Sequence, residues 1–169
     1  SSTVTVSCAN PTETYTGSPI TPCSASFTTV DGLSGSLSVS YTANTDVGTV
    51  TASAEYLGDD NHIGDTDSTT FDITPASTVT VVSCPSSVAY NGLAQTPCTV
   101  SVTGAGALSL SPDADYLNNT NAGTATASYT YAGDTNHTGS SDSETFTIGA
   151  IDPVCTITGY TGIYDAVAH

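Results

Sequence analysis

The sequence contains no lysine and no arginine. Its 169 residues include 16 aspartates and glutamates and three histidines, which gives a formal net charge of −16 at pH 7. A surface that binds nucleic acid needs cations to neutralise phosphates, and so does electrostatic attachment to an anionic membrane. We therefore expect no nucleic-acid partner and no attachment to lipid headgroups, whereas divalent cations and basic partners stay open.

Two further absences limit the class of protein. The chain has no tryptophan and no run of 18 apolar residues. The first absence excludes the Cys–Trp–Cys pattern of antibody domains, and the second excludes a transmembrane helix, so we expect no membrane insertion. Ser1 does not begin a signal-peptide pattern, which predicts a mature chain or an excised piece.

Motifs that carry catalysis are also missing. The sequence has no nucleophile elbow, no zinc-protease motif and no phosphate-binding loop. We expect no catalytic residues and no enzyme activity.

Hydroxyl side chains dominate what is present. Serine and threonine together supply 55 residues, while only 9% of the residues are charged. A polar, acidic chain of this kind is compatible with disorder. The regular positions of valine, isoleucine, tyrosine and phenylalanine argue instead for a folded chain.

The chain repeats itself at an interval of 75 residues. The stretch Tyr56-Leu57-Gly58-Asp59-Asp60-Asn61-His62 returns as Tyr131-Ala132-Gly133-Asp134-Thr135-Asn136-His137. The surrounding residues return as well, as Tyr41 and Tyr116 or Phe71 and Phe146 show. This internal repeat predicts a domain at residues 1–75, a second at 76–150, and the incomplete beginning of a third at 151–169.

Alternation with a period of two predicts strands throughout both copies. The clearest example places Val50, Ala52, Ala54 and Tyr56 on one face, matched by Ala125, Ala127, Tyr129 and Tyr131 in the second copy. Each of these two sets should face a core.

Other segments of each copy also read as strands. Thr3–Cys8 should form a half-buried strand, and Thr78–Val81 should be the strand that begins the second copy. Ser36–Tyr41 should carry Leu37, Val39 and Tyr41 on one face, and a later strand should bury Phe71 and Ile73. Short strands separated by evenly spaced turns, with no helical periodicity, predict an all-β fold of tandem Ig-like β-sandwiches of about 75 residues each.

The repeated Tyr-x-Gly-Asp-x-Asn-His stretch, followed by a Phe-x-Ile strand, resembles the signature of bacterial immunoglobulin-like tandem repeats in large secreted surface proteins and adhesins. The last residues, Ile157-Thr158-Gly159-Tyr160-Thr161-Gly162-Ile163-Tyr164-Asp165, resemble the opening of the related MBG or YDG repeats. The resemblance implies an extracellular, tandem, Ig-like array. It implies no catalytic residues.

Four of the five cysteines fall into two similar pairs. Cys8 and Cys23 are 15 residues apart, and Cys84 and Cys98 are 14 apart. Because each pair is separated by one strand and one turn, we predict the disulfides Cys8–Cys23 and Cys84–Cys98, which place the protein outside the reducing cytosol. A metal site is the alternative, but the spacing is not that of zinc ligands. Cys155 is left over, unpaired or bonded to another chain.

The acidic loops are candidate cation sites. Asp59, Asp60 and Asp65 lie near His62, and Asp134 lies beside His137. Since calcium prefers several oxygen ligands, calcium is the one cofactor that these carboxylates suit. The second copy has Thr135 and Ser140 in place of Asp60 and Asp65. The competing interpretation is a tight turn, in which Asp and Asn bind their own main chain and Gly permits positive φ.

These observations favour a structural role at the cell surface or outside the cell. We expect a segment of an extracellular fibre, stalk or adhesin, whose partners are copies of itself or neighbouring repeats joined end to end. The alternative is an adhesion module that binds a glycan or protein receptor through loops that differ between copies. We also expect residues 151–169 to be held by the second copy, by a following repeat or by a neighbouring chain, since two strands alone bury too little apolar surface.

Overall fold

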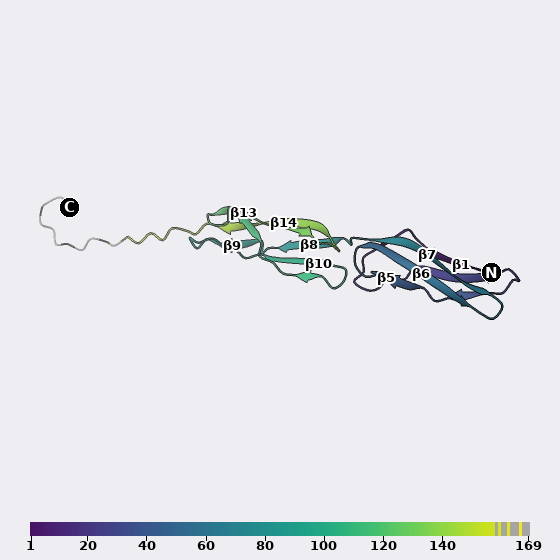
Figure 1. The fold of residues 1–169 in the computed structure, drawn as a ribbon. Coiled ribbons are helices and arrows are strands. Elements are labelled where there is room, and N and C mark those ends of the chain that lie inside the picture. Colours follow the sequence, from purple (N-terminus) through teal and green to yellow (C-terminus); the bar gives the residue numbers. More distant parts are fainter. Residues whose placement is uncertain (158, 160–161, 163–165, 167–169) are drawn as a thin grey trace.

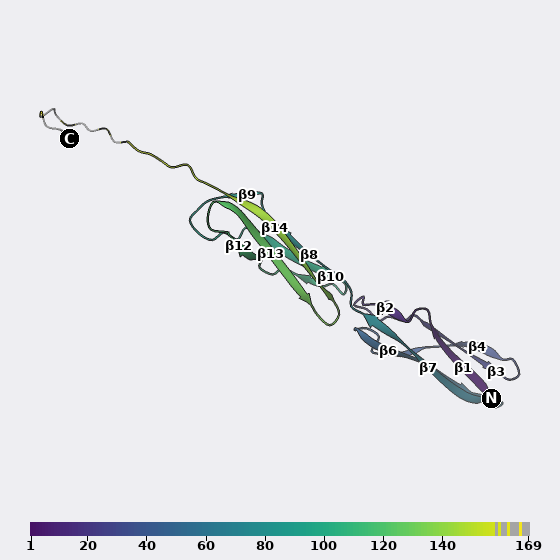
Figure 2. The ribbon, with the colours of Figure 1, turned by 90° about the horizontal axis from the view of Figure 1, so that it is seen from above.

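The computed structural model describes residues 1–157, 159, 162 and 166, and all of their regular secondary structure is β. This confirms the predicted all-β fold. In that part of the chain no helix is present, and hence none that is long and apolar enough to cross a membrane. The strands form two successive sandwiches that lie end to end along one axis (Figures 1 and 2).

The first sandwich consists of strands β1 to β7. They are β1 (Ser2–Cys8), β2 (Thr12–Thr14), β3 (Cys23–Thr29), β4 (Ser34–Leu37), β5 (Ser40–Thr42), β6 (Gly48–Gly58) and β7 (Ile63–Thr74). One sheet has the order β1-β3-β4 and the other has the order β2-β7-β6-β5. The short strand β2 runs parallel to β7, and the other pairs are antiparallel.

The second sandwich repeats this arrangement with strands β8 to β14. They are β8 (Thr78–Ser83), β9 (Ser87–Ala89), β10 (Thr99–Gly104), β11 (Ser109–Leu110), β12 (Asp115–Leu117), β13 (Gly123–Gly133) and β14 (Thr138–Gly149). Its sheets have the orders β8-β10-β11 and β9-β14-β13-β12, strand for strand the same as in the first sandwich.

The predicted alternation accounts for both cores. Val50 and Ala52 on β6 are fully buried, and Phe71 and Ile73 on β7 are each only 2% exposed. Their outward neighbours are polar, so each strand buries one face, as a period of two requires. The equivalent residues Ala125, Ala127, Phe146 and Ile148 are buried in the second sandwich.

The prediction of one strand from Ser36 to Tyr41 was wrong. The chain leaves the first sheet after Leu37 and joins the second sheet at Ser40, as β4 and β5. Leu37, Val39 and Tyr41 all pack against the core, but they reach it from both layers and from the crossing between them. An alternating pattern does not reveal such a crossing, because the side chains that line it also point inward.

The prediction that equivalent residues are always 75 positions apart was also wrong at β8, the first strand of the second sandwich. Val79 and Val81 are 59% and 46% exposed, whereas Thr78, Thr80 and Val82 are buried. The cysteines explain the shift, since the span between the paired residues is 15 in the first sandwich and 14 in the second. Val6 therefore corresponds to Val82 at an offset of 76, and a one-residue change exchanges the two faces of a strand.

The two layers of the first sandwich are joined at the edge of β1. The Val4 N–H donates to Asp65 Oδ2 at 2.7 Å, and the Val6 N–H donates to Asp67 Oδ2 at 2.8 Å. Both carboxylates come from β7 in the other sheet. They satisfy the open donors of an edge strand, which would otherwise offer a template for pairing with another chain.

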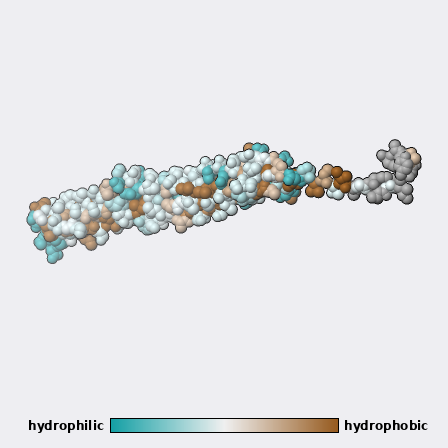
Figure 3. Space-filling view, turned by 180° about the vertical axis from the view of Figure 1, so that it is seen from behind, coloured by the Kyte–Doolittle hydropathy of each residue, from teal (hydrophilic) through white to brown (hydrophobic). Residues whose placement is uncertain are grey.

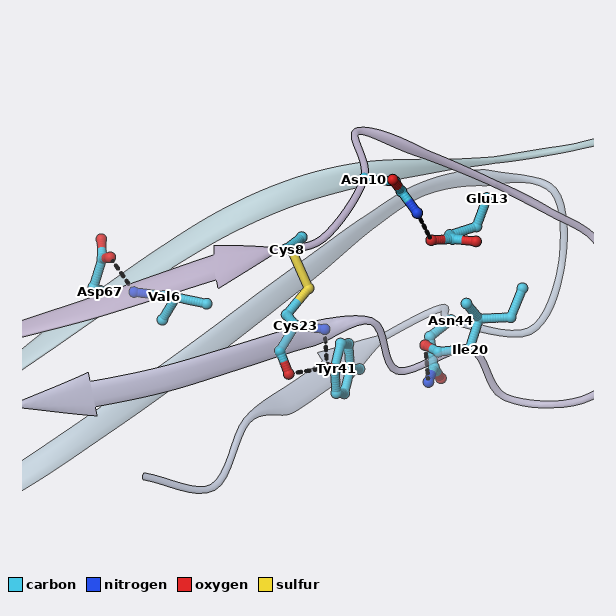
Figure 4. Close-up of a disulfide and its surroundings, with 9 residues drawn as sticks. All are labelled: Val6, Cys8, Asn10, Glu13, Ile20, Cys23, Tyr41, Asn44 and Asp67. Carbon is cyan, nitrogen blue, oxygen red and sulfur yellow. Dashed lines mark hydrogen bonds between the residues drawn. A yellow bond between two sulfur atoms is a disulfide. The ribbon is translucent and has the colours of Figure 1, made fainter. Parts of the chain in front are cut away.

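Both predicted disulfides are present. Cys8 and Cys23 bond at the end of the β1–β3 ladder, where they are directly opposite one another, and Cys84 bonds Cys98. Beside the first disulfide, the Tyr41 hydroxyl accepts from the Cys23 N–H at 3.0 Å and donates to the Cys23 carbonyl at 3.1 Å (Figure 4). Tyr116 makes the same two contacts with Cys98.

Residues 150–157 continue away from the second sandwich, at the end opposite the first (Figures 1 and 2). They have no regular structure, and Val154 and Ile157 are 93% and 90% exposed. Cys155 is exposed and has no partner in the described part of the chain. The first of the three expected arrangements, packing on the second sandwich, is therefore wrong for these residues. Tyr160 and Tyr164, which also belong to that prediction, lie outside the described residues.

Candidate functional site: the histidine loops and the junction

The turn between β6 and β7 is organised by one carboxylate. Asp59 Oδ1 accepts from the main-chain N–H groups of Asn61 and His62, both at 2.9 Å, and Asp59 Oδ2 accepts from the Tyr56 hydroxyl at 3.0 Å. This is the tight turn that the sequence predicted as the alternative to a cation site.

The ring of His62 connects this turn to the turn between β3 and β4. Its Nδ1 lies 2.8 Å from Asp59 Oδ1, and its Nε2 lies 3.0 Å from Asp31 Oδ1. Neither carboxylate is a donor, so both nitrogens must carry a proton for both bonds to form. In its protonated form His62 therefore holds the two loops together through both bonds. Sequence reasoning missed Asp31, because it lies 31 residues away and has no acidic counterpart in the second copy.

The second sandwich holds its corresponding turn in the same way, with one difference. His137 Nδ1 lies 2.9 Å from Asp134 Oδ1, but its Nε2 lies 3.0 Å from the main-chain carbonyl of Ala105. A carbonyl also accepts only, so His137 makes both bonds only when both of its nitrogens carry a proton. At 7% exposure it is buried, whereas its neighbour in the turn, Asn136, is half-buried.

These contacts shift several pKa values. Hydrogen bonds to Asp31 and then Asp59 raise the pKa of His62, and the bond to Ala105, opposed by burial and helped by Asp134, raises the pKa of His137. The Thr29 hydroxyl and then His62 lower the pKa of Asp31 to about 2.

Stability should consequently fall as the pH rises above neutrality. A raised folded-state pKa contributes stability that is complete below about pH 6.5, the ordinary histidine value, and is lost as the pH passes the folded-state pKa. We expect a lower unfolding temperature at pH 9 than at pH 6, and NMR titration midpoints above about 6.5 for both rings. The double variant His62→Gln, His137→Gln should lose most of this dependence. An equal pH dependence in the variant would contradict the assignment.

The second histidine loop also lies at the contact between the sandwiches. Here the main chains of the two sandwiches touch: a Cβ placed on Gly17 would collide with Gly106 Cα, and the Gly106 N–H donates to the Thr16 carbonyl at 3.2 Å. The Tyr15 ring meets the His137 ring edge to face, with centroids 5.2 Å apart.

Asn136 adds a second point of contact, on another loop of the first sandwich. Its Oδ1 accepts from the Val47 N–H at 3.0 Å, and its Nδ2 donates to Asp46 Oδ1 at 3.0 Å. Its counterpart in the first copy, Asn61, is exposed.

The linker Thr74-Pro75-Ala76, which connects β7 to β8, is part of this junction. Ala76 pairs with His137 as an isolated parallel bridge, its N–H donates to the Asn136 carbonyl at 2.9 Å, and its carbonyl accepts from the Thr138 N–H at 2.8 Å. The side chain of Ala76 is buried. We call this set of contacts, made by residues 15–17, 46–47, 76, 105–106 and 136–137, the junction.

The four candidate calcium ligands do not come together. The Asp65 carboxylate accepts from Val4, the Asp59 and Asp134 carboxylates belong to two different turns, and Asp60 is exposed. No group of three or more His, Cys, Asp or Glu side chains suited to a metal ion occurs within the described residues.

The outer end of the first sandwich differs from the end that forms the junction. Val30, Leu57 and Ile63 are 81%, 82% and 77% exposed there. The residues at these positions in the second sandwich are smaller or polar: Ala105, Ala132 and Thr138. In Figure 3 apolar and hydrophilic residues mix at this end of the rod, opposite the tail.

No protein-family model matches the sequence, and a comparison with curated proteins finds no match either.

Proposed function

We propose that this chain is a rigid spacer segment of an extracellular stalk, fibre or surface adhesin. In it, Ig-like sandwiches, each with its own internal disulfide, follow one another end to end. The junction is the observation that carries the proposal. Two separate segments of the first sandwich contact two loops of the second, and the linker is itself paired with the second sandwich. A flexible tether between independent binding domains would not need these contacts.

The composition supports the same role. Disulfides persist in oxidising compartments outside the cytosol, and two of them join neighbouring strands of small sandwiches here. The surface is rich in hydroxyl groups and carries charge of one sign, which keeps a long array soluble.

The test is whether the two sandwiches tumble as one body. We expect residual dipolar couplings, measured by NMR on the full chain in a weakly aligning medium, to fit one alignment tensor for residues 2–74 and 78–149. Two tensors of different magnitude would overturn the proposal.

A matched pair of variants examines the junction itself. Asn136→Ala removes the bonds to Val47 and Asp46, so hydrogen exchange should become faster at the Val47 and Gly106 amides. Asn61→Ala makes the same change in the turn of the first sandwich, where no other sandwich is in contact, and should leave both amides unaffected. Equal effects of the two variants would show that the Asn136 contacts do not hold the junction.

A second candidate function is an adhesion module, and the outer end of the first sandwich favours it. Three exposed apolar side chains surround the turns that carry Asp31, Asp59 and Asp60. Since the chain has no lysine or arginine, these charges would suit a protein receptor whose apolar surface is rimmed by basic residues.

Arrays of receptor ectodomains and of glycans, probed with the full chain, test this candidate. The triple variant Val30→Ala, Leu57→Ala, Ile63→Thr gives this end the residues of the second sandwich and should lose the receptor signal. A signal that the triple variant keeps, a signal only on glycans, or silence on both arrays would count against this end as the receptor site.

A further inference from the structure

The open end of the second sandwich repeats the half of the junction that the first sandwich supplies. Tyr90 corresponds to Tyr15, Ala122 to Val47, and Gly92 to Gly17. The two glycines share a left-handed main chain, with φ of 78° and 81°.

The same hydrogen bonds shape both ends. The N–H of Tyr15 donates to Thr74 and that of Tyr90 donates to Gly149, both at 2.9 Å. The Asn44 and Asn119 side chains bond the carbonyls of Ile20 and Gln95 in the same way. The end of the second sandwich therefore has the shape that the first sandwich presents at the junction, and none of the described residues forms a further sandwich against it.

This end of the second sandwich also has a hollow at its surface, and the chain continues from it. A hollow of about 410 Å³ lies among Tyr90, Asn121, Ala122, Ala150 and Ile151. The chain leaves the second sandwich after Gly149, the last residue of β14, as it leaves the first after Thr74, the last residue of β7, so that Ala150 and Ile151 correspond to Pro75 and Ala76.

The half of the junction that the second sandwich supplies requires a glycine at one position of its turn. A Cβ on Gly106 would lie 2.6 Å from the Tyr15 hydroxyl oxygen, so a side chain at this position would collide with the tyrosine. Gly106 and Ala107 both have positive φ, 63° and 61°, which is the conformation of a type I′ turn. This turn directs the Gly106 N–H at the Thr16 carbonyl.

The outer end of the first sandwich lacks both features. Asp31 stands in place of Gly106, and its side chain is bonded to His62 and Thr29. Between Thr29 and Leu33 only Gly32 has a positive φ, 91°, so this turn has a different main-chain path. This end of another copy does not fit against Tyr90 in the geometry of the junction.

We propose that the open end of the second sandwich, around Tyr90 and Gly92, is a docking surface for a further sandwich whose approaching turn carries glycine at the position of Gly106. The first sandwich of another copy is excluded as the partner. The inference rests on the proposed function and deepens it, because it names which kind of unit continues the array.

Three longer chains test the docking surface. The first is residues 1–149 followed by a second copy of residues 75–150, so that the added sandwich presents Gly106. The second is residues 1–149 followed by residues 75–76 and then 1–75, so that it presents Asp31. The third equals the second, with Val30→Ala, Asp31→Gly and Gly32→Ala in the added sandwich, which gives it the turn residues 105–107.

Residual dipolar couplings report whether the added sandwich shares the alignment tensor of its neighbour. We expect a shared tensor in the first and third chains and a loss of alignment magnitude for the added sandwich in the second. Amide dispersion confirms that each added sandwich is folded. Independent tumbling of the added sandwich in the first chain, or rigid attachment in the second, would overturn the inference.

The internal junction between residues 2–74 and 78–149 is the reference in every chain. If it stays rigid while the added sandwich of the first chain tumbles freely, the docking inference alone fails. If the reference pair itself fits two tensors, the proposed function fails.

Discussion

Phe71→Ala should lower the free energy of unfolding of the first sandwich by about 3–5 kcal/mol, the usual loss for a fully buried phenylalanine. Phe71 is 2% exposed, packs with Val50 and Ile73, and meets the Tyr41 ring edge to face with centroids 6.4 Å apart. Removing the ring leaves a cavity that neighbouring strands, tied by the Cys8–Cys23 disulfide, close only partly.

A domain of about 75 residues has a total stability on the order of 4–11 kcal/mol, so this loss removes a large share of it. Urea unfolding of the full chain, followed by NMR peaks assigned to each sandwich, gives the two stabilities separately. The second sandwich should keep its midpoint in this variant, and Phe146→Ala should produce the mirror result.

Phe27→Ala is the matched control. Phe27 is half-buried and stacks on Tyr56 with centroids 4.1 Å apart, so its removal opens a surface groove rather than an internal cavity. We expect a smaller loss than for Phe71→Ala. A cost as large as that of Phe71→Ala would show that burial in the core does not set the energetics of this sandwich.

Replacing Cys8 and Cys23 together by alanine should cost the first sandwich about 3 kcal/mol. The disulfide closes a span of 15 residues in the unfolded chain, and the chain-entropy model assigns about this value to a loop of that length. Replacing Cys84 and Cys98 should cost the second sandwich nearly the same, because its span is 14 residues.

The measurement is again urea unfolding resolved by sandwich. All chains carry Cys155→Ser, since an exposed thiol exchanges with disulfides during unfolding. The parent with both disulfides intact is the reference. An unchanged midpoint in the first sandwich would mean that the tyrosine contacts around Cys23 hold these strands without the covalent bond.

Local alternation in the sequence was sufficient to predict the fold class and most of the core. Val50, Ala52 and Phe71 follow directly from a period of two, because alternate residues of a strand lie on one face and the apolar face is the one that a core buries. The cysteine pairs followed from their spacing, since one strand and one turn bring the two ends of such a segment together.

Register and layer crossing were decided by long-range structure. The first strand of the second sandwich reads equally well in either register, and the position of its cysteine selects the one that buries Thr80 and Val82. The division of the predicted third strand into β4 and β5 likewise depends on which sheet accepts each half.

The candidate site was the part of the structure that the sequence predicted least completely. The motif that ends in His62 and His137 was recognised as a turn, but its far contacts were not. Asp31, Tyr15 and Ala105 lie 31, 122 and 32 residues from the histidines that they contact. Nothing local distinguishes a turn that faces solvent from one that faces another sandwich. The sequence by itself determined two sandwiches with equivalent turns, whereas only the tertiary structure decided that the second turn forms the junction, because a contact between loops distant in the chain depends on how whole sheets are placed.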